Sequence, residues 1–265
     1  MTIVKEYRIR NNCTVDEYRI AQLYAVAQMS KNETGGGEGV EVVKNEPYDN
    51  ELGKGQYTYK IYHLGSRVPA IIRSLIPKDA LLVYEEAWNG YPHCKTVVTS
   101  PFMKESMKIV TETMHLADRG DTENAVGLDA ATLAQRTVEY LDVADNELIR
   151  KSAYKEEEDP SLYKSKKTSR GPLNKPEWEK ECEPVMTCYK VLTAEFKWWP
   201  ITGTAEALIQ STMRTVFLMF HRQLFCQTDE WYGLTIEDIR KLEDETAAEL
   251  VEKRKQEATS KTDFS

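Results

Sequence analysis

The fold of this chain is indicated most directly by the residues from Gly55 to Leu64, which read GQYTYKIYHL. β-Branched and aromatic residues dominate the run, and that composition is typical of a β-strand. Because side chains alternate between the two faces of a strand, Thr58 and Lys60 share one face with Gln56 and Tyr62. Taken alone, the strand favours an interpretation in which Thr58 and Lys60 face water. The alternative is that both point inward, toward a buried polar ligand.

The overall composition limits the class of protein. The chain has 265 residues, of which 41% are hydrophobic, and a net charge of −8 with an isoelectric point near 5.3. This acidity argues against binding to nucleic acid and against tight electrostatic attachment to anionic membranes. The five cysteines form no Cys-x-x-Cys pair, no signal peptide is recognisable, and no run approaches about eighteen apolar residues. The sequence therefore predicts a soluble, cytoplasmic protein.

The N-terminal half is predicted to be mainly β-structure around one helix. Residues 3–10 alternate in polarity and predict a strand, after which Thr14 and Glu17 form a capping box that opens a helix. The apolar stripe of this helix contains Gln22, which lies either at the stripe edge or against a buried ligand. The glycine-rich run 35–39 leads into a strand rather than a helix, so we interpret it as a flexible turn and not a phosphate loop. Further predicted elements are a strand at 40–43, a short helix bounded by Pro69 and Pro77, and a hairpin at 80–88 and 91–100 that turns at Asn89-Gly90.

The C-terminal half is predicted to end in two long helices. Residues 154–172 carry charges of both signs and no apolar period, which indicates a solvated loop and not a domain boundary. The amphipathic run Thr204–Cys226 predicts the longest helix, and Thr235 begins a second one. Glu243 lies on the apolar stripe of that second helix, where a charge needs a partner or a ligand, and the tail after Glu252 is expected to fray. The other predicted elements are strands at 107–115, 137–143 and 186–196 and a short helix at 129–136.

This order of elements belongs to the α+β class, with a curved, mostly antiparallel sheet gripping a long helix. The hollow between sheet and helix would be lined by polar side chains on otherwise apolar faces, namely Gln22, Thr58, Lys60, Thr113 and Glu243. Such a lining suits an amphipathic ligand with a polar head and long apolar chains. The sequence contains no Gly-x-Ser-x-Gly elbow, phosphate-loop motif or His-Glu-x-x-His motif, and its four histidines are isolated. Neither a catalytic group nor a metal site is predicted.

Several runs resemble those of the class I phosphatidylinositol transfer proteins, in the small single-domain, alpha/beta-type group. The resemblance extends from residue 1 to about residue 250. The runs that carry it are residues 30–42 (SKNETGGGEGVEV), 55–64 (GQYTYKIYHL), 87–89 (AWN), 157–160 (EEDP), 170–173 (RGPL), 196–199 (FKWW) and 220–226 (FHRQLFC).

The resemblance implies a START-like helix-grip fold with one lipid-binding domain at residues 1–252 and a charged C-terminal tail at 253–265. It implies a cavity that encloses one phospholipid as cargo, without a cofactor. The implied function is exchange of phosphatidylinositol and phosphatidylcholine between membranes. The implied protein is a monomer that visits membrane surfaces transiently, serves phosphoinositide signalling and binds no nucleic acid.

The same resemblance assigns roles to individual residues. It places the inositol head group against Thr58, Lys60, Glu85, Asn89 and Glu243, and the phosphate against Gln22, Thr96, Thr113 and Lys190. It places Cys94 beside the head group. It implies a membrane-docking pair, Trp198 and Trp199, a mobile lipid-exchange lid that includes Ile71, Ile72, Leu75 and Ile76, and a regulatory phosphorylation site at Ser165.

Two other classes of function stay open from the sequence. One is a lipid-processing enzyme of the same hollow fold, for which Glu243 is the only obvious candidate base. The other is a membrane-recruited scaffold that holds a structural lipid. For the tryptophan pair, strand alternation alone requires that at least one ring points away from the interior, which fits either membrane contact or an ordinary surface aromatic.

Overall fold

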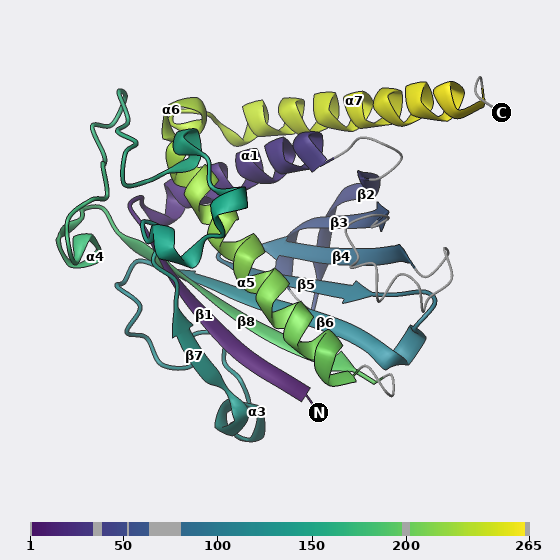
Figure 1. The fold of residues 1–265 in the computed structure, drawn as a ribbon, viewed down its shortest axis with the longest axis horizontal. Coiled ribbons are helices and arrows are strands. Elements are labelled where there is room, and N and C mark those ends of the chain that lie inside the picture. The colour runs from purple at the N-terminus through teal and green to yellow at the C-terminus, as the bar shows by residue number, and fades with distance from the viewer. Residues whose placement is uncertain (1, 34–38, 52, 64–80, 198–201, 263–265) are drawn as a thin grey trace.

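The structure, a computed structural model, describes residues 2–33, 39–51, 53–63, 81–197 and 202–262 (Figure 1). Its strands are β1 (Thr2–Asn11), β2 (Gly39–Asn50), β3 (Gly53–His63), β4 (Leu82–Gly90), β5 (His93–Thr99), β6 (Met107–Leu116), β7 (Thr137–Tyr140) and β8 (Met186–Phe196). Its α-helices are α1 (Val15–Glu33), α3 (Ala130–Gln135), α4 (Trp178–Glu181), α5 (Thr202–Cys226), α6 (Thr228–Trp231) and α7 (Ile236–Thr262).

The described strands form one sheet in the order β2-β3-β4-β5-β6-β8-β1-β7. Neighbouring strands are antiparallel, except that β7 runs parallel to β1. This mixed sheet with long helices confirms the predicted α+β class. The strand predicted from GQYTYKIYHL is β3, which lies between β2 and β4.

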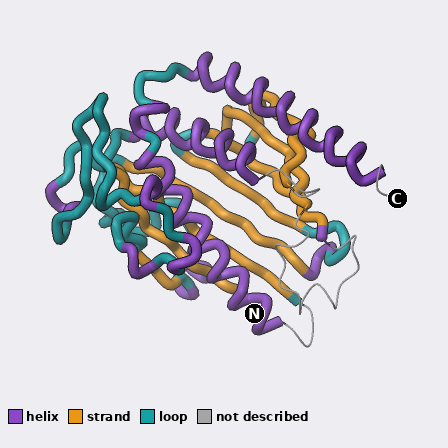
Figure 2. The backbone as a smooth tube through the Cα atoms, turned by 45° about the horizontal axis from the view of Figure 1, so that its top comes forward, coloured by secondary structure: helices purple, strands orange, loops and turns teal. Residues whose placement is uncertain are grey.

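The helices are concentrated at the two ends of one face of the sheet (Figures 1 and 2). Helix α5 packs on β1 and β8, whereas α1 and α7 lie side by side and approach β2. The main core lies where β1, β8, α1 and α5 meet, and it contains Tyr7, Tyr18, Leu192 and Leu224. Strands β3 to β6 lie between these two helix-covered ends.

Local sequence signals account for the ends of the long helices. The capping box at α1 is confirmed, because Thr14 N–H donates to Glu17 Oε2 at 2.8 Å and Glu17 N–H donates to Thr14 Oγ1 at 3.1 Å. Thr235 and Asp238 make the equivalent reciprocal pair before α7, with N···O distances of 2.9 and 3.2 Å. Helix α7 then continues to Thr262, ten residues beyond the Glu252 position after which the tail was expected to fray. Helical backbone bonds continue through that charged segment.

The hairpin was predicted correctly, but its turn was not. Gly90 pairs with His93, so Tyr91 and Pro92 form the turn, and Asn89 remains in the strand opposite Cys94. A turn at Asn89-Gly90 of the expected type needs positive φ angles, and neither residue has one. Gly90 instead permits close packing, since a Cβ atom there would lie 2.6 Å from the Tyr48 hydroxyl. Strand β7 is also shorter than predicted, because it pairs with β1 only from Thr137 to Tyr140.

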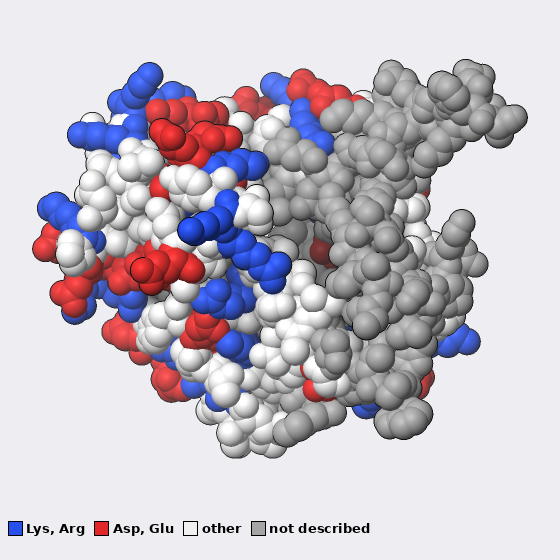
Figure 3. Space-filling view, viewed as in Figure 1, with Lys and Arg blue, Asp and Glu red and all other residues white. Residues whose placement is uncertain are grey.

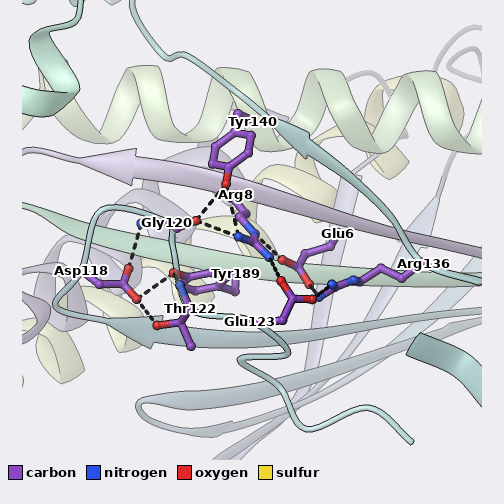
Figure 4. A network of polar contacts seen from close by, with 9 residues as sticks. All are labelled: Glu6, Arg8, Asp118, Gly120, Thr122, Glu123, Arg136, Tyr140 and Tyr189. Carbon is purple, nitrogen blue, oxygen red and sulfur yellow. Dashed lines mark hydrogen bonds and ion pairs between the residues drawn. The ribbon is translucent and has the colours of Figure 1, made fainter. Parts of the chain in front are cut away.

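The face of the sheet opposite α5 is closed by a network of charged and polar groups (Figure 4). Buried Glu6 accepts from Arg8 Nε at 2.5 Å and from Arg136 Nη1 at 2.6 Å. Exposed Glu123 pairs with both arginines. Arg8 Nη1 donates to the carbonyl oxygen of Gly120 at 2.8 Å. The network ties the segment after β6 and the start of β7 to β1.

Candidate functional site

Strand register places most of the predicted site residues on one face of the sheet. Directly paired residues share a face, and one cross-strand row runs Gln56, Asn89, Cys94, Thr113, Lys190, Tyr7. The next row contains Thr58, Ala87, Thr96, Thr111 and Leu192, and the one after it contains Lys60, Glu85 and Val98. This inner face is the one that α5 covers, because the Tyr7 ring contacts Phe217 of α5 edge-on, with 5.5 Å between ring centroids.

The inner face is hollow between its two helix-covered ends. The space-filling view shows a depression at this place, with acidic atoms on its floor (Figure 3). Thr58, Thr96 and Asn89 are half-buried there, whereas residues of β8 under α5, such as Leu192, are fully buried. Thr58 and Lys60 therefore point inward. This supports the second interpretation of the strand, which its sequence alone did not favour.

At the β3–β4 end of the inner face, Glu85 is held by two partners. The Lys60 ammonium lies 3.9 Å from Glu85 Oε1, and the Tyr62 hydroxyl lies 3.2 Å from both carboxylate oxygens. The Lys60 residue is only 9% exposed. A charged pair of this kind, with a tyrosine attached, offers both donors and acceptors to a polar ligand.

Glu243 reaches this end of the sheet from α7. Its Oε2 accepts from Asn45 Nδ2 of β2 at 3.3 Å and from Arg240 Nη1 at 2.5 Å. Asn45 lies opposite Thr58 and accepts in turn from Gln56 Nε2 at 2.7 Å. The charge on the apolar stripe of α7 is thus paired. Sequence reasoning missed Asn45 and Gln56, because they come from other elements and leave no local signal. It also missed Arg240, although the i,i+3 spacing from Glu243 on the same helix was a signal that could have found it.

Near the other end of the row lies Lys190, a second cation of the inner face. Among the described residues, no carboxylate lies within ion-pair distance of its ammonium, which lies 5.3 Å from the centroid of the Phe217 ring. Burial, and then the charge of Lys190, lowers the pKa of His115 to about 3. Burial raises the pKa of the Cys94 thiol to about 11, although Lys190 acts in the opposite direction. His115 and Cys94 are thus both neutral at neutral pH and do not compensate the charge of Lys190.

A buried polar chain supports this end of the site and was not predicted. His221 Nδ1 donates to Asn11 Oδ1 at 2.9 Å, since the amide nitrogen of Asn11 is used by the carbonyl oxygen of Ile9. The other ring nitrogen, Nε2, lies 3.5 Å from the hydroxyl of Tyr18, which is one helical turn before Gln22 on α1. Burial lowers the pKa of His221 well below its ordinary value. The Tyr18 ring also contacts the His115 ring, with 5.0 Å between centroids, so two histidines that are isolated in the sequence meet at Tyr18.

The remaining predicted residues divide into three groups. Gln22 is half-buried on α1 and Thr113 is buried on β6. Ser165 makes its contacts away from the inner face. It is buried, and its hydroxyl donates to Asp229 Oδ1 at 2.6 Å. The predicted lid residues and the tryptophan pair lie outside the described residues: Ile71, Ile72, Leu75, Ile76, Trp198 and Trp199.

Asp229 fixes the loop that carries Ser165. Besides the serine hydroxyl, its carboxylate accepts from the backbone N–H groups of Lys166 and Lys167 at 2.9 and 3.0 Å. These hydrogen bonds lower the pKa of Asp229 to about 2. The Ser165 hydroxyl is therefore committed to a neighbour in this conformation, and its regulatory role stays a prediction.

Taken together, the fold and the inner face define an α+β protein whose curved sheet presents polar side chains between two helix-covered ends. The described residues include no helix that is long and apolar enough to cross a membrane. The chain belongs to the phosphatidylinositol transfer protein family, whose model matches residues 2–248.

Individual relatives agree with this assignment. The chain is 52% identical over 252 residues to phosphatidylinositol transfer protein 2 of Dictyostelium discoideum, covering 95% of this chain and 96% of the relative. It is 49% identical over 260 residues to the human phosphatidylinositol transfer protein beta isoform, covering 96% of each. It is 44% identical to the human membrane-associated phosphatidylinositol transfer protein 2, where the match covers 96% of this chain and 19% of the relative.

Proposed function

We propose that this protein encloses one phosphatidylinositol or phosphatidylcholine molecule in the hollow and exchanges it between membranes. The observation that carries the proposal is the inner face itself. It presents an ammonium group, Lys190, without an ionic partner among the described residues, and hydroxyl, amide and carboxylate groups a few strands away. A lipid phosphate suits the first feature and an inositol ring suits the second. Transfer of phosphatidylinositol is also what the names of the relatives state for those proteins.

The energetics of the cargo favour complete enclosure. Two acyl chains contain roughly thirty carbons, and exposing each to water costs about 0.8 kcal/mol, or about 25 kcal/mol in all. A carrier must therefore cover both chains in transit and open only at a membrane. In this proposal the protein works as a cytoplasmic monomer that visits membrane surfaces, and the segment with Ile71, Ile72, Leu75 and Ile76 opens to admit the lipid.

Native mass spectrometry of the full-length protein tests the proposal directly. One intact phospholipid that exchanges with added vesicles supports a carrier. Release of free fatty acid would show lipid-processing activity, and a lipid that never exchanges would show a scaffold. Either of these two results contradicts the proposal.

The head-group residues provide a sharper prediction. Thr58→Asp or Lys60→Ala is expected to lower phosphatidylinositol transfer at least about tenfold, because a missing partner leaves buried polar groups unpaired. Phosphatidylcholine transfer should stay near normal, since choline has no hydroxyl groups to bind. Thr58→Asp should be the more severe change, because it adds a carboxylate opposite Asn45, which already donates to the carboxylate of Glu243. The measurement is transfer of both labelled lipids by the same preparation, and an equal loss of both would mean that these residues support only the fold.

A further inference from the structure

Tyr62 was not among the residues predicted for the lipid site, yet it is one of the two partners that hold Glu85. It lies on the inner face of β3, two residues beyond Lys60, whose direct partner on β4 is Glu85. Its hydroxyl lies 3.2 Å from Glu85 Oε1 and 3.2 Å from Glu85 Oε2. One hydroxyl proton is thus shared between both carboxylate oxygens, a geometry that fixes how the carboxylate plane is turned.

This bond leaves most of the carboxylate available to a ligand. A carboxylate has about four lone-pair sites, and a single tyrosine proton occupies the region between its two oxygens. Lys60 Nζ is 3.9 Å from Oε1, which is beyond ordinary hydrogen-bond distance, so the ammonium spends none of its donors on a close hydrogen bond to Glu85. The side chains of Lys60 and Glu85 are only 11% and 19% exposed. Both charged groups are therefore kept oriented in a sheltered place.

We propose that Tyr62 is a positioning residue for polyol head groups, which turns the Glu85 carboxylate so that it accepts from ring hydroxyls beside the Lys60 ammonium. This inference rests on the proposed function, because it presumes that the ligand is phosphatidylinositol. Tyr62 acts through Glu85 and does not have to touch the lipid. Preorganising a carboxylate in this way favours a ligand with hydroxyl donors over one without them.

The chain contains a matched control on the opposite face of the same two strands. The Tyr57 hydroxyl donates to Glu86 Oε1 at 2.8 Å. Tyr57 lies two residues from Tyr59, the direct partner of Glu86, just as Tyr62 lies two residues from the direct partner of Glu85. Tyr57→Phe and Tyr62→Phe therefore remove the same kind of bond between β3 and β4. They differ in which face of the sheet loses it.

The experiment compares transfer of labelled phosphatidylinositol and phosphatidylcholine by full-length wild type, Tyr62→Phe and Tyr57→Phe. We expect Tyr62→Phe to lower phosphatidylinositol transfer about tenfold relative to phosphatidylcholine, as loss of a hydrogen bond to a charged group implies. Tyr57→Phe should leave the ratio of the two lipids unchanged. A Tyr62→Phe protein that transfers both lipids normally, or loses both equally, overturns the proposal.

A double-mutant cycle separates positioning from direct contact. In a Glu85→Gln background, Tyr62→Phe should change phosphatidylinositol transfer by less than about twofold, because the residue through which it acts is already altered. Equal losses in both backgrounds would mean that Tyr62 binds the lipid itself, and the positioning role would be rejected. Glu85→Asp keeps Tyr62 but shortens the acidic side chain. This variant should also lose phosphatidylinositol transfer and keep phosphatidylcholine transfer. If the wild-type protein carries no phosphatidylinositol at all, the proposed function is wrong. If it carries phosphatidylinositol and Tyr62→Phe does not change the ratio of the two lipids, only the positioning role is wrong.

Discussion

Cys94 lies between Asn89 and Thr113 in the cross-strand row of the inner face, and only 8% of the residue is exposed. Its neighbours thus belong to the set assigned to the lipid head group. Burial raises the pKa of its thiol to about 11, so at neutral pH almost all of it is protonated. A reagent that modifies Cys94 would therefore lie among the head-group residues. Because the thiolate is the nucleophile, the raised pKa would also slow the reaction at neutral pH.

We predict that a maleimide attached at Cys94 blocks lipid loading, because the adduct occupies head-group space. The rate of block should rise about tenfold per pH unit between pH 7 and 9, since the thiolate fraction rises in that proportion well below the pKa. The measurement is lipid uptake from vesicles after timed alkylation. Cys94→Ala should load lipid normally and resist the reagent. Equal inhibition of both proteins would assign the effect to another cysteine.

Single site residues could be predicted from the sequence where they interrupt the regular apolar pattern of a strand or helix. The combined pattern of polar groups on apolar faces selected Gln22, Thr58, Lys60, Thr113 and Glu243. The last four lie on inner surfaces of the fold, and Gln22 is half-buried on α1. Their partners were not predictable. Nothing local links Asn45 on β2 with Glu243 on α7, because only the docking of α7 beside that strand brings them within 3.3 Å.

At the scale of elements, one buried ion pair joins α5 to the long loop before β8. Arg222 of α5 donates from Nη1 to the Val143 carbonyl oxygen at 2.6 Å and from Nη2 to Asn146 Oδ1 at 2.8 Å. Its Nη2 also lies 3.5 Å from Asp159 Oδ1, and both charged side chains are 1% exposed. The loop was predicted to be solvated, but Asp159 anchors it to the helix.

We predict that Arg222→Leu lowers the free energy of unfolding by about 3–5 kcal/mol, because it leaves the Asp159 carboxylate buried without its cation. Lys180→Met is the control. It removes an exposed pair with Glu177, in which the two side chains are 69% and 66% exposed, and should cost at most about 1 kcal/mol. Urea unfolding of both variants provides the comparison. Similar losses would mean that the buried pair adds little beyond a surface contact.

The elements themselves were predicted well where one signal dominated. The strand predicted at 186–196 has the same ends as β8, and the capping residues correctly predicted where α1 and α7 begin. The prediction of a turn at Asn89-Gly90 was wrong, because strand pairing continues to Gly90 and His93 despite the strong local preference of these residues for a turn. The position of a turn is thus set by the partner strand as much as by the turn residues.

At the scale of the whole molecule, net charge constrains how the protein meets a membrane. A charge of −8 provides no general attraction to anionic lipids. For the membrane visits that we propose, we therefore expect apolar contact to provide the attachment. Tryptophan prefers the membrane interface, and the adjacent pair Trp198 and Trp199 directly follows β8 and Lys197 in the chain.

We predict that replacing Trp198 and Trp199 together with alanine abolishes transfer between vesicles, while the fold and the bound lipid persist. The physical reason is that an acidic carrier without an apolar anchor spends too little time at the bilayer to open and exchange its cargo. Thermal unfolding and native mass spectrometry should match wild type, and vesicle-to-vesicle transfer should fall to background. The control variant carries Val138→Ala with Leu162→Ala, which removes two other exposed apolar side chains, 41% and 58% exposed. Unchanged transfer by the tryptophan variant, or equal loss in the control, would show that docking depends on some other surface.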